Sequence, residues 1–272
     1  MDTPYDSRPI GIFDSGVGGL TVLKELIAAF PHEHFIYLGD TARVPYGAKS
    51  VRTVERYTIQ VANFLIQRNV KGLIAACNTA SALGLGALRA HCETPVLGVI
   101  QPGCQKALAE MKSRSGHIGI IGTRSTIASG AYPNTLALLK PALKVSSLAC
   151  PLFVPLVEEG WINHGATRLI VEENLAPFLK DPVDILILGC THYPVLKPII
   201  AQVLGPRTQL IDSAEAVVEA LEKLMNQLLL PTQPDAKQRV DFYVTDVADR
   251  FQEVAGRFLG EIAVDRVEMV DL

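Results

Sequence analysis

The sequence predicts an α/β fold built from two similar halves, and three observations lead to this prediction. Short apolar, β-branched runs recur along the chain, helical patterns separate many of them, and two of the runs return later with their surroundings. Near-continuous apolar runs are typical of strands that are buried on both faces of a parallel sheet. Strands that alternate with helices predict helices layered on such sheets.

The predicted strands are seven runs rich in Val, Ile, Leu and Gly. They cover residues 9–14, 34–40, 72–78, 95–100, 117–123, 184–190 and 209–213. The predicted helices cover residues 18–30, 50–69, 81–92, 104–114 and 214–230. Ligands of open α/β sheets bind beyond the carboxyl ends of the strands. Polar or thiol side chains fall at these ends: Asp14, Asp40, Asn78, Thr123, Cys190 and Asp212.

An internal repeat suggests that the two halves are related. "IGIFDSGVGG" from residue 10 resembles "IGIIGTRSTI" from residue 118, and "LIAACNTAS" from residue 73 resembles "LILGCTHYP" from residue 186. Both features recur in the same order and at nearly the same offset. The repeat therefore predicts two related α/β halves whose strand ends face each other across a cleft, with Cys77 in one half and Cys190 in the other.

Composition narrows the class of protein. The 272 residues are 49% hydrophobic and 19% charged, which allows a sizeable core and argues against disorder. A net charge of −3 without a basic cluster argues against a nucleic-acid partner. The chain starts without a signal-peptide pattern and has no apolar run of about 18 residues, so we expect no membrane span. Its five cysteines form no C-x-x-C motif or zinc-type array, which predicts reduced thiols in the cytoplasm and no metal site.

The glycine-rich stretch "GIFDSGVGG" does not fit a nucleotide site. Val17 stands where a P-loop has Lys, and Thr21 stands where a dinucleotide fingerprint has its last glycine. The turn can still present backbone N–H groups to a carboxylate, with Asp14 facing an ammonium group of the same ligand. The alternative is a tight turn in which Asp14 caps the following helix. The segment "YLGDTARVPYG" at 37–47 is likewise open between a surface loop and a ligand-binding loop.

Cys77 and Cys190 carry the strongest chemical signal. A lone strand-end cysteine is usually a small core residue, but both of these precede polar side chains that a dry core would leave unpaired. Two thiols can serve disulfide redox chemistry, a single nucleophile with its base, or proton transfer on the two sides of one carbon. The third interpretation explains the duplication best, because inverting a stereocentre needs an acid and a base on opposite faces.

These segments together resemble the cofactor-independent glutamate racemases. The matching motifs are "IGIFDSGVGGLTV", "YLGDTARVPYG", "ACNTASA", "GVIQPG", "PLVEEG" and "LGCTHYPVL", in the order of that family, from residue 10 to about residue 200. The resemblance implies two Rossmann-like or flavodoxin-like α/β domains, pseudo-two-fold related, with the active site in the cleft between them. One domain would comprise 1–98 plus 213–272, completed by the C-terminal segment, and the other 99–212.

The resemblance also implies an activity. An isomerase of this family interconverts L- and D-glutamate without a cofactor and supplies D-glutamate for peptidoglycan, and family members are often homodimers. The alternatives are aspartate racemase, another two-cysteine racemase or decarboxylase, a non-catalytic amino-acid sensor, and a thiol-redox protein. Aspartate racemases tend to carry Glu after the Cys-Thr pair, so His192 favours glutamate.

The residue roles follow from the same resemblance. Cys77 and Cys190 would be the acid–base pair, with Cys77 deprotonating D-glutamate and Cys190 L-glutamate, while Asp14, Glu158 and His192 would tune them. Glu158 is preferred to Glu159, although the motif alone does not separate them. The predicted substrate-binding residues are Asp14, Ser15, Tyr46, Gly47, Asn78, Thr79, Thr191 and His192. Ser15, Asn78, Thr79 and Thr191 would hold the α-carboxylate, and Tyr46 and Gly47 the side-chain carboxylate.

Overall fold

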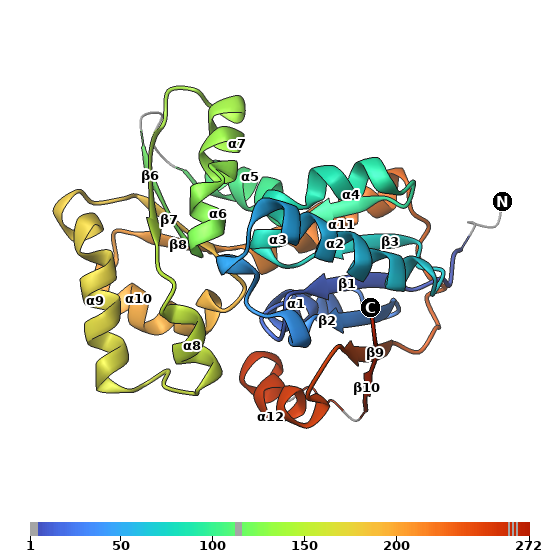
Figure 1. The fold of residues 1–272 in the computed structure, drawn as a ribbon. Coiled ribbons are helices and arrows are strands. Elements are labelled where there is room, and N and C mark those ends of the chain that lie inside the picture. The colour runs from blue at the N-terminus through green and yellow to red at the C-terminus, as the bar shows by residue number, and fades with distance from the viewer. Residues whose placement is uncertain (1–4, 112–115, 261, 263, 265) are drawn as a thin grey trace.

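The computed structural model describes residues 5–111, 116–260, 262, 264 and 266–272, and within them the chain forms two sheets flanked by helices (Figure 1). One sheet runs in the order β10 (Val267–Met269), β9 (Arg239–Val244), β2 (His34–Gly39), β1 (Ile10–Asp14), β3 (Gly72–Ala75), β4 (Val96–Gly98). The other runs in the order β6 (Lys144–Ala149), β5 (His117–Gly122), β7 (Ile185–Gly189), β8 (Gln209–Asp212). All neighbouring strands pair in parallel.

The two sheets repeat one strand order, which confirms the predicted α/β fold with two similar halves. The order β2-β1-β3-β4 in the first sheet is matched by β6-β5-β7-β8 in the second. In each, the chain places its second strand on one side of the first and its third strand on the other. Such a switch in direction opens a crevice at the carboxyl ends of the strands. Cys77 follows β3 and Cys190 follows β7, so each cysteine lies beside the switch point of its own sheet.

The connecting segments form α-helices and short 3₁₀ turns. The α-helices are α1 (Leu20–Ala29), α2 (Val51–Ile66), α3 (Asn78–Leu83), α4 (Leu85–His91), α5 (Ile100–Glu110), α6 (Arg124–Ala128), α7 (Ala131–Leu139), α8 (Phe153–Glu158), α9 (Gly165–Lys180), α10 (Lys197–Leu204), α11 (Ser213–Gln227) and α12 (Ala248–Leu259). The 3₁₀ turns are η1 (Thr41–Arg43), η2 (Tyr46–Ala48) and η3 (Tyr193–Leu196). None of the helices in the described parts of the chain is long and apolar enough to cross a membrane.

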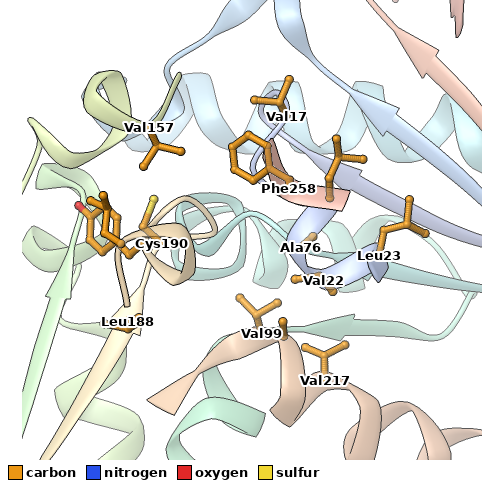
Figure 2. Packing of buried hydrophobic residues seen from close by; sticks show 14 of the residues in the cluster. Val17, Val22, Leu23, Ala76, Val99, Val157, Leu188, Cys190, Val217 and Phe258 are labelled. Atoms are coloured by element: carbon orange, nitrogen blue, oxygen red, sulfur yellow. The ribbon is translucent and has the colours of Figure 1, made fainter. Parts of the chain in front are cut away.

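The core follows the alternation of side chains along the strands. In β1, Ile10 and Ile12 pack into the cluster that contains α1 and α12 side chains, whereas Phe13 packs into the cluster on the α2 side. The first of these clusters continues into the other half, where it includes Leu188 and Cys190 (Figure 2). The two halves therefore share one apolar core instead of being joined only by linkers.

The sequence patterns miss several elements and misplace some ends. They do not reveal β6, β9 and β10, or helices α6 to α10 and α12. β6 is largely half-exposed and contains two serines, so it lacks the apolar run of a buried strand. The helix predicted from residue 81 begins at Asn78, and the one predicted over 104–114 begins at Ile100. Residues 112–114 of that prediction, and residues 1–4 of the predicted first domain, lie outside the described residues.

A buried ion pair lies at the amino ends of strands β2 and β3 of the first sheet, at the opposite end from the cysteines. Lys71 Nζ lies 2.7 Å from Glu33 Oε2, and both side chains are almost fully buried. The ammonium also donates to the backbone carbonyls of Asp6 and Leu230 at 2.9 Å. Glu33 accepts from the backbone N–H and the hydroxyl of Thr232. The pair thus fastens both the segment that precedes β1 and the segment that leads from α11 to β9.

Replacing Lys71 by Met should leave the Glu33 carboxylate buried without its cation. Breaking a buried pair in this way costs about 3–5 kcal/mol of the free energy of unfolding. The matched control is Lys144→Met, because the Lys144–Asp181 pair is exposed and solvent screens such pairs, so its loss should change the free energy of unfolding much less. Urea denaturation measures both losses, and equal losses in the two variants would contradict the assignment.

Candidate active site

A cavity of about 350 Å³ lies between the two halves and is lined from both of them. All of the predicted site residues except Asp14 line it. From the first half these are Ser15, Tyr46, Gly47, Cys77, Asn78 and Thr79, and from the second half Glu158, Cys190, Thr191 and His192. The other three cysteines do not line it, and all five thiols are free. The cavity therefore joins two thiols that are more than a hundred residues apart in the sequence.

Cys190 begins a chain of three ionisable groups. Its Sγ lies 3.9 Å from Nδ1 of His192, and Nε2 of His192 lies 2.8 Å from Oε1 of Glu158. Burial lowers the pKa of His192, but the hydrogen bonds to Cys190 and Glu158 outweigh burial and raise the pKa to about 10. Burial likewise opposes the charge on Glu158, yet the bond to His192 holds the pKa of this carboxyl below its ordinary value. His192 is therefore an imidazolium that donates from both nitrogens.

Cys77 has a different environment. Its sulfur accepts the backbone N–H of Ala80 at 3.5 Å, and its thiol donates to Ser15 Oγ at 3.5 Å. Burial and the negative charge of Asp14 raise the pKa of Cys77 to about 12, against these hydrogen bonds. Cys77 is therefore a neutral thiol near pH 7. The bond from Ala80 also explains why α3 starts directly after Cys77, because the sulfur caps the first turn.

Asp14 is buried and does not line the cavity. Its carboxylate accepts the backbone N–H of Gly16 at 2.9 Å and the hydroxyl of Thr191 at 3.4 Å. Burial raises the pKa of Asp14, while the charge of His192 and these donors act against burial. Asp14 therefore connects the glycine-rich turn of the first half to the Thr191–His192 turn of the second.

Two polar clusters anchor the residues after Cys77. The amide nitrogen of Asn78 donates to Tyr132 Oη at 2.8 Å and to Ser213 Oγ at 3.1 Å. Its buried Oδ1 has no hydrogen-bond partner within the described chain. The hydroxyl of Thr79 lies 3.0 Å from those of both Thr123 and Thr126. Both clusters reach into the second half and fix the first turn of α3 against it.

The Pro-Tyr-Gly loop enters the cavity, but its phenol points elsewhere. Tyr46 Oη donates to Asp40 Oδ2 at 2.5 Å, and the same carboxylate accepts from Arg43 Nε and Thr245 Oγ1. Asp40, which the sequence places at a strand end, is fully buried and does not line the cavity. The loop therefore presents its backbone to a ligand, and the Asp40 cluster holds it in place.

The structure separates the two glutamates of "PLVEEG". Glu158 lines the cavity and binds His192, whereas Glu159 forms an exposed ion pair with Arg250 of α12. Sequence reasoning did not assign Thr123, Pro151, Val154 and Pro155, which also line the cavity. For Thr123 the position at the end of a predicted strand was a usable signal. The other three precede or lie in α8, which carries no strand-end signature.

Comparison with known proteins places this geometry in a family. The model for Asp/Glu/Hydantoin racemase matches residues 10–221. The chain belongs to this racemase family. It is 47% identical to the glutamate racemase of Syntrophus aciditrophicus over 264 residues, 96% of this chain and 97% of the relative. The resemblance that the motifs suggested is thereby confirmed.

Solved structures agree with the family assignment. The glutamate racemase of Francisella tularensis, crystallised with D-glutamate, superposes with a TM-score of 0.90 at 37% identity, over 97% of this chain and 98% of that one. The glutamate racemase of Thermus thermophilus, crystallised with β-chloro-D-alanine, gives a TM-score of 0.86 at 42% identity, over 98% of each chain. The racemase fold with its cleft between two halves is therefore common to these proteins.

The state of His192 leads to a pH prediction. In the native protein its imidazole should titrate near pH 10 instead of its ordinary value of about 6.5. Because the pKa of His192 is raised in the folded state, protonated His192 stabilises the folded protein. This contribution to the free energy of unfolding is fully present below about pH 6.5 and is lost as the pH rises through 10. Nitrogen chemical shifts of the imidazole measure the midpoint.

Two neighbouring variants control this measurement. Glu158→Gln should lower the midpoint, because it removes the negative partner of Nε2. Glu159→Gln should leave it close to that of the wild type, because Glu159 faces Arg250. A wild-type midpoint near 6.5 would show that the imidazolium chain is not formed.

Proposed function

We propose that this protein interconverts L- and D-glutamate by two-base proton transfer at the α-carbon, without a cofactor. The observation that carries the proposal is the pair of thiols that line one cavity from equivalent strand ends of two halves. The near-complete coverage of glutamate racemases at 45–48% identity supports glutamate as the substrate. A relative of known structure binds D-glutamate, which supports the same cavity as the binding site.

The proton transfer uses the two thiols in opposite protonation states. A thiolate on one face removes the α-proton and forms an S–H bond while the Cα–H bond breaks. The thiol on the opposite face then gives its proton to the carbanion and becomes a thiolate, so the configuration inverts and one proton is exchanged. In the reverse direction the two sulfurs exchange roles.

The two sulfurs have different electrostatic surroundings. The imidazolium of His192 stabilises negative charge on the adjacent sulfur of Cys190. Cys77 is protonated near pH 7, because burial and Asp14 raise its pKa to about 12. The imidazolium is thus beside Cys190, whereas Cys77 is placed as the acid. In agreement with the family resemblance, we assign deprotonation of L-glutamate to Cys190 and of D-glutamate to Cys77.

The contacts around the cavity suggest how glutamate binds. The nitrogen of the Asn78 amide is already engaged, so the unpartnered Oδ1 of the same side chain can accept from the substrate ammonium. The first-turn N–H groups of α3 and the hydroxyl of Ser15 can receive the α-carboxylate. Because the phenol of Tyr46 is bound to Asp40, the backbone N–H groups at Tyr46 and Gly47 are the donors for the side-chain carboxylate.

Removal of an α-proton next to a carboxylate builds negative charge that the site must stabilise. Pyridoxal enzymes use the cofactor as an electron sink. Here preorganised hydrogen-bond donors would stabilise this negative charge. The functional side chains of the cavity are mostly buried, and electrostatic interactions there are stronger than in water.

Four further proposals concern the molecule as a whole. We propose that it works in the cytoplasm, supplies D-glutamate for peptidoglycan precursors and forms a homodimer. We also propose the domain division 1–98 plus 213–272 and 99–212. The membership of the two sheets supports this division, since β1 to β4, β9 and β10 form one sheet and β5 to β8 the other.

The decisive assay follows L-glutamate in D₂O by circular dichroism and by deuterium at the α-carbon, with EDTA present and no pyridoxal phosphate. The wild type should lose optical activity and take up deuterium. Cys77→Ala and Cys190→Ala should each lower the racemisation rate by at least about 10²-fold, the lower range for a positioned acid or base. Cys150→Ala is the matched control, because Cys150 is buried outside the cavity, and it should stay within a few-fold of the wild type.

Other outcomes identify the rival functions. Turnover of aspartate in place of glutamate would make the protein an aspartate racemase. Binding of glutamate without α-proton exchange in folded protein would favour an amino-acid sensor. Activity that survives in both cysteine variants would refute the two-thiol mechanism.

A further inference from the structure

Two consecutive residues of α12 contact His192 and Glu158, the two groups that are hydrogen-bonded in series to Cys190. Arg257 Nη1 donates to the backbone carbonyl of Glu158. The ring of Phe258 meets the ring of His192 edge to face, with centroids 5.5 Å apart and an interplanar angle of 89°. Neither residue lines the cavity. Their contacts are therefore with His192 and Glu158 and not with a ligand in the cavity.

The helix that carries these residues belongs to the first half, whereas Cys190 belongs to the second. α12 packs on α1 and β10, and Figure 1 shows it next to the end of α8. Phe258 is 4% exposed and lies in the shared apolar cluster with Val17, Val157 and Cys190 (Figure 2). α12 is therefore anchored to one half while it touches the proton-transfer residues of the other.

The contact of Arg257 has a physical reason. Glu158 is the last residue of α8, and the final carbonyls of a helix have no partner within the helix. A cation at this end satisfies such a carbonyl and interacts favourably with the helix dipole. Gly160 leaves room for the guanidinium, since a Cβ there would lie 3.2 Å from Cζ of Arg257. Arg257 thus fixes the end of α8, and with it the origin of the Glu158 side chain.

Phe258 restrains the ring of His192, the partner of Glu158. The two nitrogens of His192 reach Cys190 and Glu158 only in one orientation of the ring. The edge-to-face contact with the buried Phe258 opposes rotation out of that orientation. Phe258 and Arg257 together hold the ring and its carboxylate partner in register.

We propose that Arg257 and Phe258 are positioning residues for the His192–Glu158 pair, so that α12 of one half controls proton transfer at the cysteine of the other. This inference rests on the proposed racemase function. Its specific consequence is that loss of either contact slows the steps at Cys190 and leaves the steps at Cys77 unchanged.

The overall rate constants cannot reveal this asymmetry. The equilibrium constant between enantiomers is one, so kcat/KM must be equal in the two directions for any variant. Isotope effects can reveal it, because they depend on which proton transfer limits the rate. When the steps at Cys190 become slower, the isotope effect of α-deuterated substrate rises for the enantiomer that Cys190 deprotonates. It falls for the enantiomer that Cys77 deprotonates, since reprotonation then limits the rate.

The experiment measures kcat/KM and the isotope effects of α-deuterated L- and D-glutamate for Arg257→Met and Phe258→Leu. We expect kcat/KM to fall at least about 10-fold, a part of what a positioned acid–base group contributes. The two isotope effects should diverge in the same sense as in Cys190→Ser, and in the opposite sense to Cys77→Ser. Arg257→Lys keeps one donor for the carbonyl of Glu158 and should return the isotope effects toward those of the wild type.

Phe251→Leu is the matched control for a purely structural effect. Phe251 is on the same helix and equally buried, but it packs on Tyr37, with ring centroids 6.0 Å apart. It should lower stability and keep the isotope effects of the wild type. Wild-type isotope effects in Arg257→Met and Phe258→Leu, or divergence in the sense of Cys77→Ser, would overturn the inference while the racemase function stands. Absence of racemisation by the wild type would overturn both.

Discussion

The close approach of Gly18 to the Thr191–His192 turn is the constraint on which the site depends. A Cβ at position 18 would lie 2.3 Å from Thr191 Oγ1 and 2.5 Å from His192 Nδ1, so no larger residue fits without moving the turn. This approach lets the hydroxyl of Thr21 reach the carbonyl of Thr191 at 3.1 Å and that of Thr191 reach Asp14. The glycine-rich turn, which in other folds holds a phosphate, here packs one half of the molecule against the other.

The two halves share a strand order but give their cysteines unequal surroundings. Cys190 has an imidazolium beside it, whereas Cys77 accepts from the backbone N–H of Ala80, donates to Ser15 and lies close to the buried carboxylate of Asp14. The two proton transfers are thus the same chemical step in two different electrostatic surroundings. The substrate, which brings an ammonium group and two carboxylates, completes the charge distribution, so binding and proton transfer are coupled through the same few side chains.

Several features of the fold and of the site could be predicted from the sequence, and others could not. The buried strands β1, β5 and β7 have continuous apolar runs. The repeat around Cys77 and Cys190 predicted that both cysteines lie at equivalent strand ends. The strands β6 and β9 are only partly buried and carry polar residues, so no such run marks them. The partner of the Tyr46 phenol and the contacts of α12 could not be predicted for a different reason. Both depend on partners that only the tertiary fold brings near, and no local pattern encodes them.

The proposed mechanism requires Cys77 and Cys190 to work on opposite faces of one carbon. The most direct test is a crystal structure of this protein with D-glutamate bound in the cavity. The α-carbon should lie between the two sulfurs, one on each face, with reacting atoms about 3–3.5 Å apart. Both sulfurs on the same face, or an α-carbon out of reach of either one, would contradict it.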